Sequence, residues 1–321
     1  MKRIMNITTC LEDTARYRDR ADFAQFLRRF RLDGVEIMQV GQAACGVITP
    51  QDAVGVHLRY YPGWMDFWRG DEARLMLEYG DWSACEARYG GRDASALVDA
   101  YRENFRFVNT MQPEYMVLHV SDCSMVEAMR RKYHYSDEAV VDATADLMNQ
   151  AMDALQTEPW LLYENLWYPG LTLLRPEMVR RLMEKTAYQK CGVMLDTGHV
   201  MHTNLELQTP EEAVDYIHQV LDRYGDLSWI KGIHLSQSLT GRRAKALMEH
   251  WQPVKGDYQA RIWEVMGHIF EIDTHRPFAT GRINELIRRI DPEFLVLELI
   301  SGSRQEHEKL LAEQLEYLNA Q

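Results

Sequence analysis

The chain has 321 residues, of which 46% are hydrophobic and 26% charged, and this balance is typical of a globular protein with a substantial core. Its formal net charge of -12 disfavours a broad nucleic-acid-binding surface, which usually requires a basic face. The N-terminus lacks an apolar stretch and no apolar run approaches about 18 residues, so we expect neither a signal peptide nor contact with a membrane.

The cysteines predict a reducing environment. They are odd in number, widely spaced and free of any C-x-x-C pair (Cys10, Cys45, Cys85, Cys123 and Cys191). This usage is typical of free thiols rather than of a disulfide framework. We therefore expect a cytoplasmic protein.

The first part of the chain alternates apolar runs, which predict strands, with amphipathic runs, which predict helices. In chain order it contains a strand at 4–8, a helix at 22–31, strands at 33–38 and 54–58, a helix at 94–110 and a strand at 115–120. Residues 59–91 break this pattern, because they are too long for an ordinary turn and too aromatic for a disordered linker. We interpret them as an insertion that folds over another part of the molecule.

The alternation continues to the end of the chain. The predicted elements are a helix at 137–155, a strand at 160–165, a helix at 176–185, a strand at 192–196, a helix at 210–224, a strand at 229–235, a helix at 283–290, a strand at 294–298 and a helix at 304–318. Residues 238–271 are charged and have helical spacing, and we interpret them as a second insertion.

Eight strand-like runs that mostly alternate with helical segments predict an α/β protein with a (β/α)8 barrel, or TIM barrel. A doubly wound open sheet is the alternative, but the glycine-rich phosphate turn expected after its first strand is absent. We therefore predict a single barrel domain over residues 1–321, with the insertions at 59–91 and 238–271 lying over the C-terminal mouth.

Histidine and carboxylate residues recur where the predicted strands end. These candidate ligands are His57, His119, Glu164, Asp196, His199, His234, Asp273, His275 and Glu298. Active sites of such barrels lie at the C-terminal mouth, so the nine side chains should converge there. Nine nitrogen and oxygen ligands exceed what one tetrahedral zinc ion needs, and clustered carboxylates would repel one another without cations between them. The pattern therefore predicts two or three metal ions.

Taken singly, each ligand has a simpler interpretation. His57 or His119 could be a hydrogen-bonded core histidine, Glu164 or Glu298 could pair with an arginine, and Asp196 could cap a helix. The metal interpretation is favoured because the simpler one would have to hold separately at every strand end. His202 follows His199 in the same loop, and we assign it to packing or to the surface.

The strand-end residues resemble those of the endonuclease IV group within the xylose isomerase-like TIM barrels. The most specific motifs are Leu195-Asp196-Thr197-Gly198-His199, and Asp273-Thr274-His275 followed by Gly281 before a helix. The resemblance covers most of the barrel but neither insertion. It implies a metal site held by His57, His119 and Glu164, a second held by Glu164, Asp196, His234 and Glu298, and a third held by His199, Asp273 and His275. It also implies zinc, with manganese or magnesium as alternatives, and attack on a phosphodiester by a bridging hydroxide.

Several positions depart from that group. The region after His57 is aromatic, Val120-Ser121-Asp122 replaces a glycine-containing run, and Trp167 adds bulk after Glu164. These features favour a closed pocket for a small phosphorylated or sugar-like substrate over an open DNA groove. The candidate substrate-binding residues are Tyr60, Trp64, Arg276 and Arg282.

The leading functional prediction is a metal-dependent hydrolase of phosphoesters. The alternative is a sugar or sugar-phosphate isomerase or epimerase with one divalent ion, in which Glu164 and Glu298 flank the substrate and transfer a proton. A barrel that binds a metal or ligand without turnover is the least favoured. The pair Asp273 and His275 favours hydrolysis, because the resemblance implies a third metal there that isomerases of the superfamily generally lack.

Overall fold

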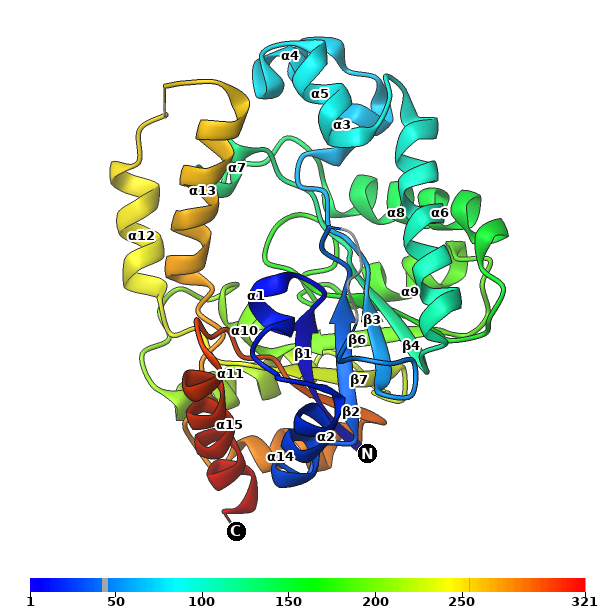
Figure 1. Cartoon of the computed structure of the whole chain (residues 1–321). Coiled ribbons are helices and arrows are strands. Elements are labelled where there is room, and N and C mark those ends of the chain that lie inside the picture. Colours follow the sequence, from blue (N-terminus) through cyan, green and yellow to red (C-terminus); the bar gives the residue numbers. More distant parts are fainter. Residues whose placement is uncertain (42–45, 254, 321) are drawn as a thin grey trace.

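The fold is a closed barrel of parallel strands, as seen in a computed structural model that describes residues 1–41, 46–253 and 255–320 (Figure 1). The strands are β1 (Lys2–Thr8), β2 (Gly34–Met38), β3 (Ala53–His57), β4 (Tyr115–His119), β5 (Trp160–Glu164), β6 (Cys191–Asp196), β7 (Ile230–Leu235) and β8 (Phe294–Leu297). Each pairs with the next along the chain, and β8 closes the barrel on β1 in parallel. The predicted (β/α)8 architecture is confirmed.

Helices surround the barrel because each presents an apolar stripe to the outer face of the sheet. This layer and its connections contain α1 (Leu11–Thr14), α2 (Arg20–Arg29), α6 (Ala94–Met111), α8 (Asp137–Ala151), the short 3-10 helix η1 (Met152–Ala154), α9 (Pro176–Lys185), α10 (Thr197–Met201), α11 (Pro210–Leu221), α14 (Ile283–Ile290) and α15 (Arg304–Asn319). In α2, for example, Phe23, Phe26 and Leu27 are buried. Helix α11 begins at a capping box formed by Thr209 and Glu212.

The two predicted insertions are largely helical. Residues 59–91 contain α3 (Trp64–Arg69), α4 (Glu72–Tyr79) and α5 (Trp82–Tyr89), and residues 238–271 contain α12 (Gly241–His250) and most of α13 (Tyr258–Ile272). Figure 1 shows these helices and α7 (Met125–Arg130) beyond the C-terminal ends of the strands. An apolar cluster separate from the main core joins α7, α12, α13 and the loop after β5.

Along the strands, the side chains that point into the barrel are apolar at first and are followed by candidate ligands at the C-terminal ends. The inner core consists of Ile4, Val54, Tyr115, Val117, Leu162, Met194, Phe294 and Val296. Because side chains two residues apart lie on the same face of a strand, Leu162 and Met194 are followed on that face by Glu164 and Asp196. The apolar interior therefore ends in a polar layer at the C-terminal mouth.

The structure also bears on the expectations about membrane contact and about the cysteines. Within the described ranges, no helix is both long and apolar enough to cross a membrane. Cys10, Cys85, Cys123 and Cys191 are free thiols, and Cys45 lies outside the described residues.

Candidate metal centre

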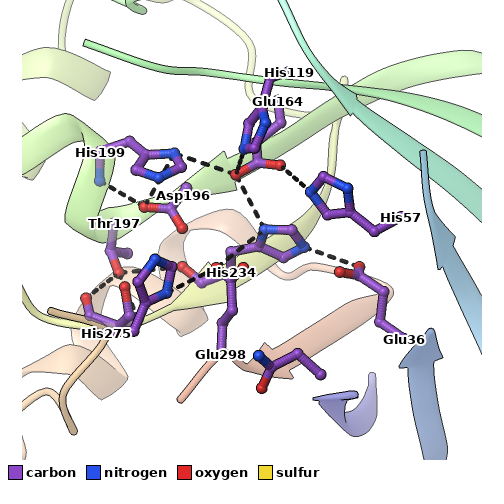
Figure 2. A network of polar contacts seen from close by, with 12 residues as sticks. Glu36, His57, His119, Glu164, Asp196, Thr197, His199, His234, His275 and Glu298 are labelled. Atoms are coloured by element: carbon purple, nitrogen blue, oxygen red, sulfur yellow. Dashed lines mark hydrogen bonds and ion pairs between the residues drawn. The ribbon is translucent and has the colours of Figure 1, made fainter. Parts of the chain in front are cut away.

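The nine candidate ligands meet at the C-terminal mouth of the barrel, around Glu164. Figure 2 labels all of them except Asp273. His57, His119, Glu164 and Asp196 end strands β3, β4, β5 and β6, and His234 lies near the end of β7. The others lie beyond strand ends: His199 in α10, Asp273 and His275 after α13, and Glu298 after β8. The side chains of Glu164 and His234 are completely buried.

The first group consists of His57, His119 and Glu164. The Nε2 atom of His57 lies 3.2 Å from Oε2 of Glu164, and the Nε2 atom of His119 lies 3.2 Å from Oε1 of the same carboxylate. One ligand atom from each residue lies within 4.8 Å of the others. Two imidazoles and a carboxylate at this spacing are a suitable ligand set for one divalent ion.

The second group shares Glu164 with the first and adds Asp196, His234 and Glu298. Its ligand atoms also lie within 4.8 Å of one another. The Nδ1 atom of His234 lies 3.2 Å from Oε1 of Glu164 and 3.4 Å from Oε2 of Glu298. Glu164 therefore stands between two groups, where a carboxylate can bridge two ions.

The third group consists of His199, Asp273 and His275, with ligand atoms within 4.8 Å of one another. Oδ2 of Asp273 lies 3.0 Å from Nε2 of His275 and 3.5 Å from Nε2 of His199. Glu298 connects this group with the second, because its Oε2 lies 3.5 Å from Nδ1 of His275. His275 has a φ of 44°, a left-handed conformation that non-glycine residues rarely adopt and that clusters at functional sites.

Several buried polar atoms of the centre make no hydrogen bond within the described part of the chain. They are Oε1 of Glu164, Oδ2 of Asp196, Nδ1 of His119, His234 and His275, and Oε2 of Glu298. Buried polar atoms normally have partners, so these unpartnered atoms are available as metal ligands. Imidazole nitrogens with carboxylate oxygens, and no thiolate, suit zinc and also admit manganese or magnesium.

Hydrogen bonds outside the groups orient several imidazoles. His57 donates from Nδ1 to the carbonyl oxygen of Leu58 at 2.8 Å, which directs its Nε2 toward Oε2 of Glu164 at 3.2 Å. His199 donates from Nδ1 to the carbonyl oxygen of Asn165 at 2.9 Å, which leaves Nε2 toward Asp273. Such bonds fix the tautomer and raise the basicity of the nitrogen that faces a metal.

Glu36 on β2 is a member of the centre that sequence reasoning missed. Its side chain is 2% exposed, and its Oε2 lies 2.9 Å from Nε2 of His234. The hydroxyl of Tyr115 donates to the same oxygen at 2.7 Å. The Tyr115 ring fits only because residue 55 is glycine, since a Cβ there would lie 2.2 Å from the ring. The available signal was a carboxylate in the middle of an apolar strand, between Val35 and Ile37.

Asn165 was also missed as a positioning residue. Its side-chain oxygen accepts the backbone N–H of Asp196 at 2.8 Å, and its amide nitrogen donates to the carbonyl oxygen of Asp196 at 3.1 Å. This pair of bonds holds the end of β5 against the end of β6. It therefore fixes the spacing of Glu164 and Asp196.

The electrostatics of the centre favour an ionised Glu164. Burial opposes its charge, but the imidazoles of His119 and His234 hold the pKa of this carboxyl well below its usual range. Burial also opposes protonation of His234, yet Glu36 and Glu164 raise its pKa well above the usual value. Glu164 is therefore ionised and His234 protonated, and a bound cation would take the place of the proton on His234.

The four candidate substrate-binding residues lie in different surroundings. Tyr60 is half-buried and meets the His119 ring edge-on at a centroid distance of 5.1 Å. The buried Trp64 indole donates to the carbonyl oxygen of Ser121 at 2.9 Å. Arg276 pairs with Glu306, and Arg282 pairs with Asp215 and Glu285. Among the described residues, no hydrogen bond or ion pair joins Trp64, Arg276 or Arg282 to the nine candidate ligands.

Comparison with known proteins identifies a matching family. The model of a family described as "Xylose isomerase-like TIM barrel" matches residues 89–321, a range that contains every candidate ligand except His57. This match confirms the predicted resemblance. No curated protein matches the chain.

Solved structures share the fold at low sequence identity. Endonuclease IV from Thermus thermophilus is 15% identical, with a TM-score of 0.51 and 99% of each chain covered. The 3-keto-D-glucoside 4-epimerase from E. coli is 11% identical, with a TM-score of 0.50 and 100% of each chain covered. A sugar phosphate isomerase/epimerase from Parabacteroides distasonis is 10% identical, with a TM-score of 0.50, covering 100% of this chain and 97% of that one.

Proposed function

The chain belongs to the xylose isomerase-like TIM barrel family, and we propose that it is a metal-dependent enzyme that hydrolyses a phosphoester bond in a small substrate. The observation that carries this proposal is the third ligand group, His199, Asp273 and His275, beside a complete four-residue group. An enzyme that needs a single divalent ion would have no evident use for this additional group.

The proposed cofactors are two or three zinc ions, held by the three groups described above, with manganese or magnesium as alternatives. Divalent cations bound there would lower the pKa of water toward neutrality and neutralise negative charge on a phosphoryl group. The two glutamates at the junctions between groups are the proposed catalytic residues. Glu164 and Glu298 can orient the attacking water, since Glu164 belongs to two ligand groups and Glu298 lies between the second and third.

Aromatic side chains beside the ligands support a small substrate rather than a DNA duplex. The Tyr60 ring contacts His119, and the Trp167 ring lies 5.2 Å from the His199 ring between centroids. The helices of the first insertion lie beyond the strand ends (Figure 1). A cytoplasmic location is part of this proposal and is supported by the free thiols of the described cysteines.

A sugar or sugar-phosphate isomerase or epimerase is the second candidate. It is favoured by the group of Glu164, Asp196, His234 and Glu298, which alone could hold one divalent ion. In that reaction Glu164 and Glu298 would transfer the proton. The third ligand group would then have no direct part in the chemistry.

The experiment that separates the two candidates compares wild type with Asp273→Ala on two kinds of substrate. We expect wild type to hydrolyse the small phosphodiester bis(p-nitrophenyl) phosphate. The activity of the variant should be at least about 100-fold lower, because removing a metal ligand should cost more than the roughly 10- to 100-fold lost on removing a residue that only hydrogen-bonds to a ligand. Interconversion of sugar phosphates that survives in Asp273→Ala would establish the isomerase instead. Ser238→Ala is the matched control, because the Ser238 hydroxyl donates to Oδ1 of Asp273 at 3.2 Å but is not itself a candidate metal ligand.

A further inference from the structure

Arg131 lies beside the mouth of the barrel and has no anionic partner among the described residues. It follows the last residue of α7, and its Nη1 donates to the carbonyl oxygen of His202 at 2.7 Å. Its Nη2 is buried and makes no hydrogen bond within the described ranges, nor does any carboxylate there form an ion pair with it. Arg74, another guanidinium near α7, pairs with both Asp66 and Glu127. What distinguishes Arg131 from the exposed arginines is that its unpartnered Nη2 atom is buried beside the barrel mouth.

His202 connects Arg131 to the third ligand group. The His202 ring lies 4.4 Å from the Trp167 ring between centroids, and its Nε2 lies 3.9 Å from Oδ1 of Asp273. Trp167 in turn packs edge-on against His199, with ring centroids 5.2 Å apart. Arg131 therefore stands one layer of side chains away from the candidate metal ligands.

Other buried polar atoms near Arg131 also have no hydrogen-bond partner in the described part of the chain. The Nε1 atom of Trp167, the hydroxyl of Tyr168 and the Nε2 atom of His202 belong to side chains that are 6%, 4% and 1% exposed. The rings of Trp167 and Tyr168 are in contact, with centroids 4.9 Å apart. Indole and guanidinium groups can only donate, so the chemistry of this cluster suits an oxygen-rich anion.

We propose that Arg131, Trp167 and Tyr168 form a subsite that binds a phosphate group of the substrate at a distance from the bond that is cleaved. This inference rests on the proposed function and specifies it: the substrate is a small phosphoester that carries a second anionic group. A guanidinium can bind phosphate through two parallel N–H donors, which supplies orientation as well as affinity. Burial lowers the pKa of Arg131, but a guanidinium stays charged at neutral pH.

The test measures binding of inorganic phosphate by calorimetry to the purified, metal-containing protein, and again after a chelator has removed the metal, so that phosphate bound by metal ions is distinguished from phosphate bound at the subsite. Arg131→Gln should weaken phosphate binding by at least about tenfold, as expected for a lost charge-assisted hydrogen bond. The phosphate affinity of Arg131→Lys should lie between those of Arg131→Gln and wild type, because lysine keeps the charge but lacks the two parallel N–H donors. Arg130→Gln is the matched control, because Arg130 is the adjacent, exposed arginine of α7, and its binding should equal that of wild type.

Unchanged phosphate binding in a folded Arg131→Gln variant would overturn the subsite, and so would an equal loss in Arg130→Gln. If Arg131→Gln does not fold, Trp167→Phe and Tyr168→Phe replace it, since each removes one donor and keeps an aromatic ring. Each should weaken phosphate binding severalfold, and wild-type affinity in both would equally refute the subsite. Because the readout is binding, it is independent of turnover, so failure of the hydrolase proposal would be recognised separately.

Discussion

His234 and Glu36 form a buried pair, with Nε2 of the imidazole 2.9 Å from Oε2 of the carboxylate. The pair joins β7 to β2 across the barrel mouth, and the hydroxyl of Tyr115 adds a second donor to the same oxygen at 2.7 Å. Glu36 thereby directs Nδ1 of His234 toward Glu164 and Glu298. A carboxylate behind an imidazole is the usual device for orienting a metal-binding histidine.

Replacing Glu36 should therefore weaken metal binding without removing a ligand. We expect Glu36→Gln to lower the affinity for zinc by about 10- to 100-fold, the usual cost of losing such a partner. Competition with a chromophoric chelator measures this affinity. Tyr115→Phe removes only the second donor to Glu36 and should have a smaller effect. Affinity of Glu36→Gln within twofold of wild type would exclude the orienting role.

Metal affinity should rise with pH. Burial opposes the charge of His275, but Asp273 and Glu298 outweigh it and raise the pKa to about 10, and the pKa of His234 is also well above its usual value. Both imidazoles are therefore protonated at neutral pH, and a cation must displace these protons. Displacement becomes easier as pH rises toward the raised pKa values, so affinity increases with pH above neutrality.

Calorimetry in buffers of different ionisation enthalpy measures the protons released on zinc binding. Release at pH 7 that declines as the pH approaches 10 is the expected result. An affinity that does not change between pH 6 and 9, with no proton release, would show that these imidazoles are not ligands. Glu36→Gln should reduce the number of protons released, because Glu36 is the largest charge that raises the pKa of His234.

Substitution of Trp64 tests whether this aromatic residue of the first insertion stabilises the fold or binds substrate. Its indole is 5% exposed and donates to the carbonyl oxygen of Ser121 at 2.9 Å. Trp64→Phe should reduce the free energy of unfolding by about 1–3 kcal/mol, because a buried acceptor loses its partner. KM should be unchanged. Trp263→Phe, at a residue 68% exposed, is the control for urea unfolding. A raised KM with unchanged stability would instead support the predicted contact with substrate.

Much of the fold and of the ligand set could be predicted because both depend on local patterns. Parallel strands buried on both faces are continuously apolar, so an acid or imidazole at the end of such a run is conspicuous. Barrel geometry then brings all strand ends to one mouth. Asp196 and His199 could be placed in this way, and the structure brings them to 3.6 Å between Oδ1 and Nδ1.

The remaining features depend on contacts that the local sequence does not specify. Glu36 looks like an isolated strand carboxylate until β2 and β7 face each other across the barrel. Arg282 lies near His275 in the sequence, but its guanidinium turns outward to Asp215 on α11. Nothing in the sequence shows that Arg131 has no carboxylate partner among the described residues. Pairing of charges between distant segments is decided by tertiary packing.

The most direct test of the account is the number of metal ions per purified chain, measured by elemental analysis for wild type and Asp273→Ala. The nine ligands in three groups predict two or three zinc ions in wild type and one fewer in the variant. A wild-type protein that retains no zinc, manganese or magnesium after dialysis would contradict the metal centre. An equal metal content in both proteins would contradict the third group, on which the hydrolase proposal depends.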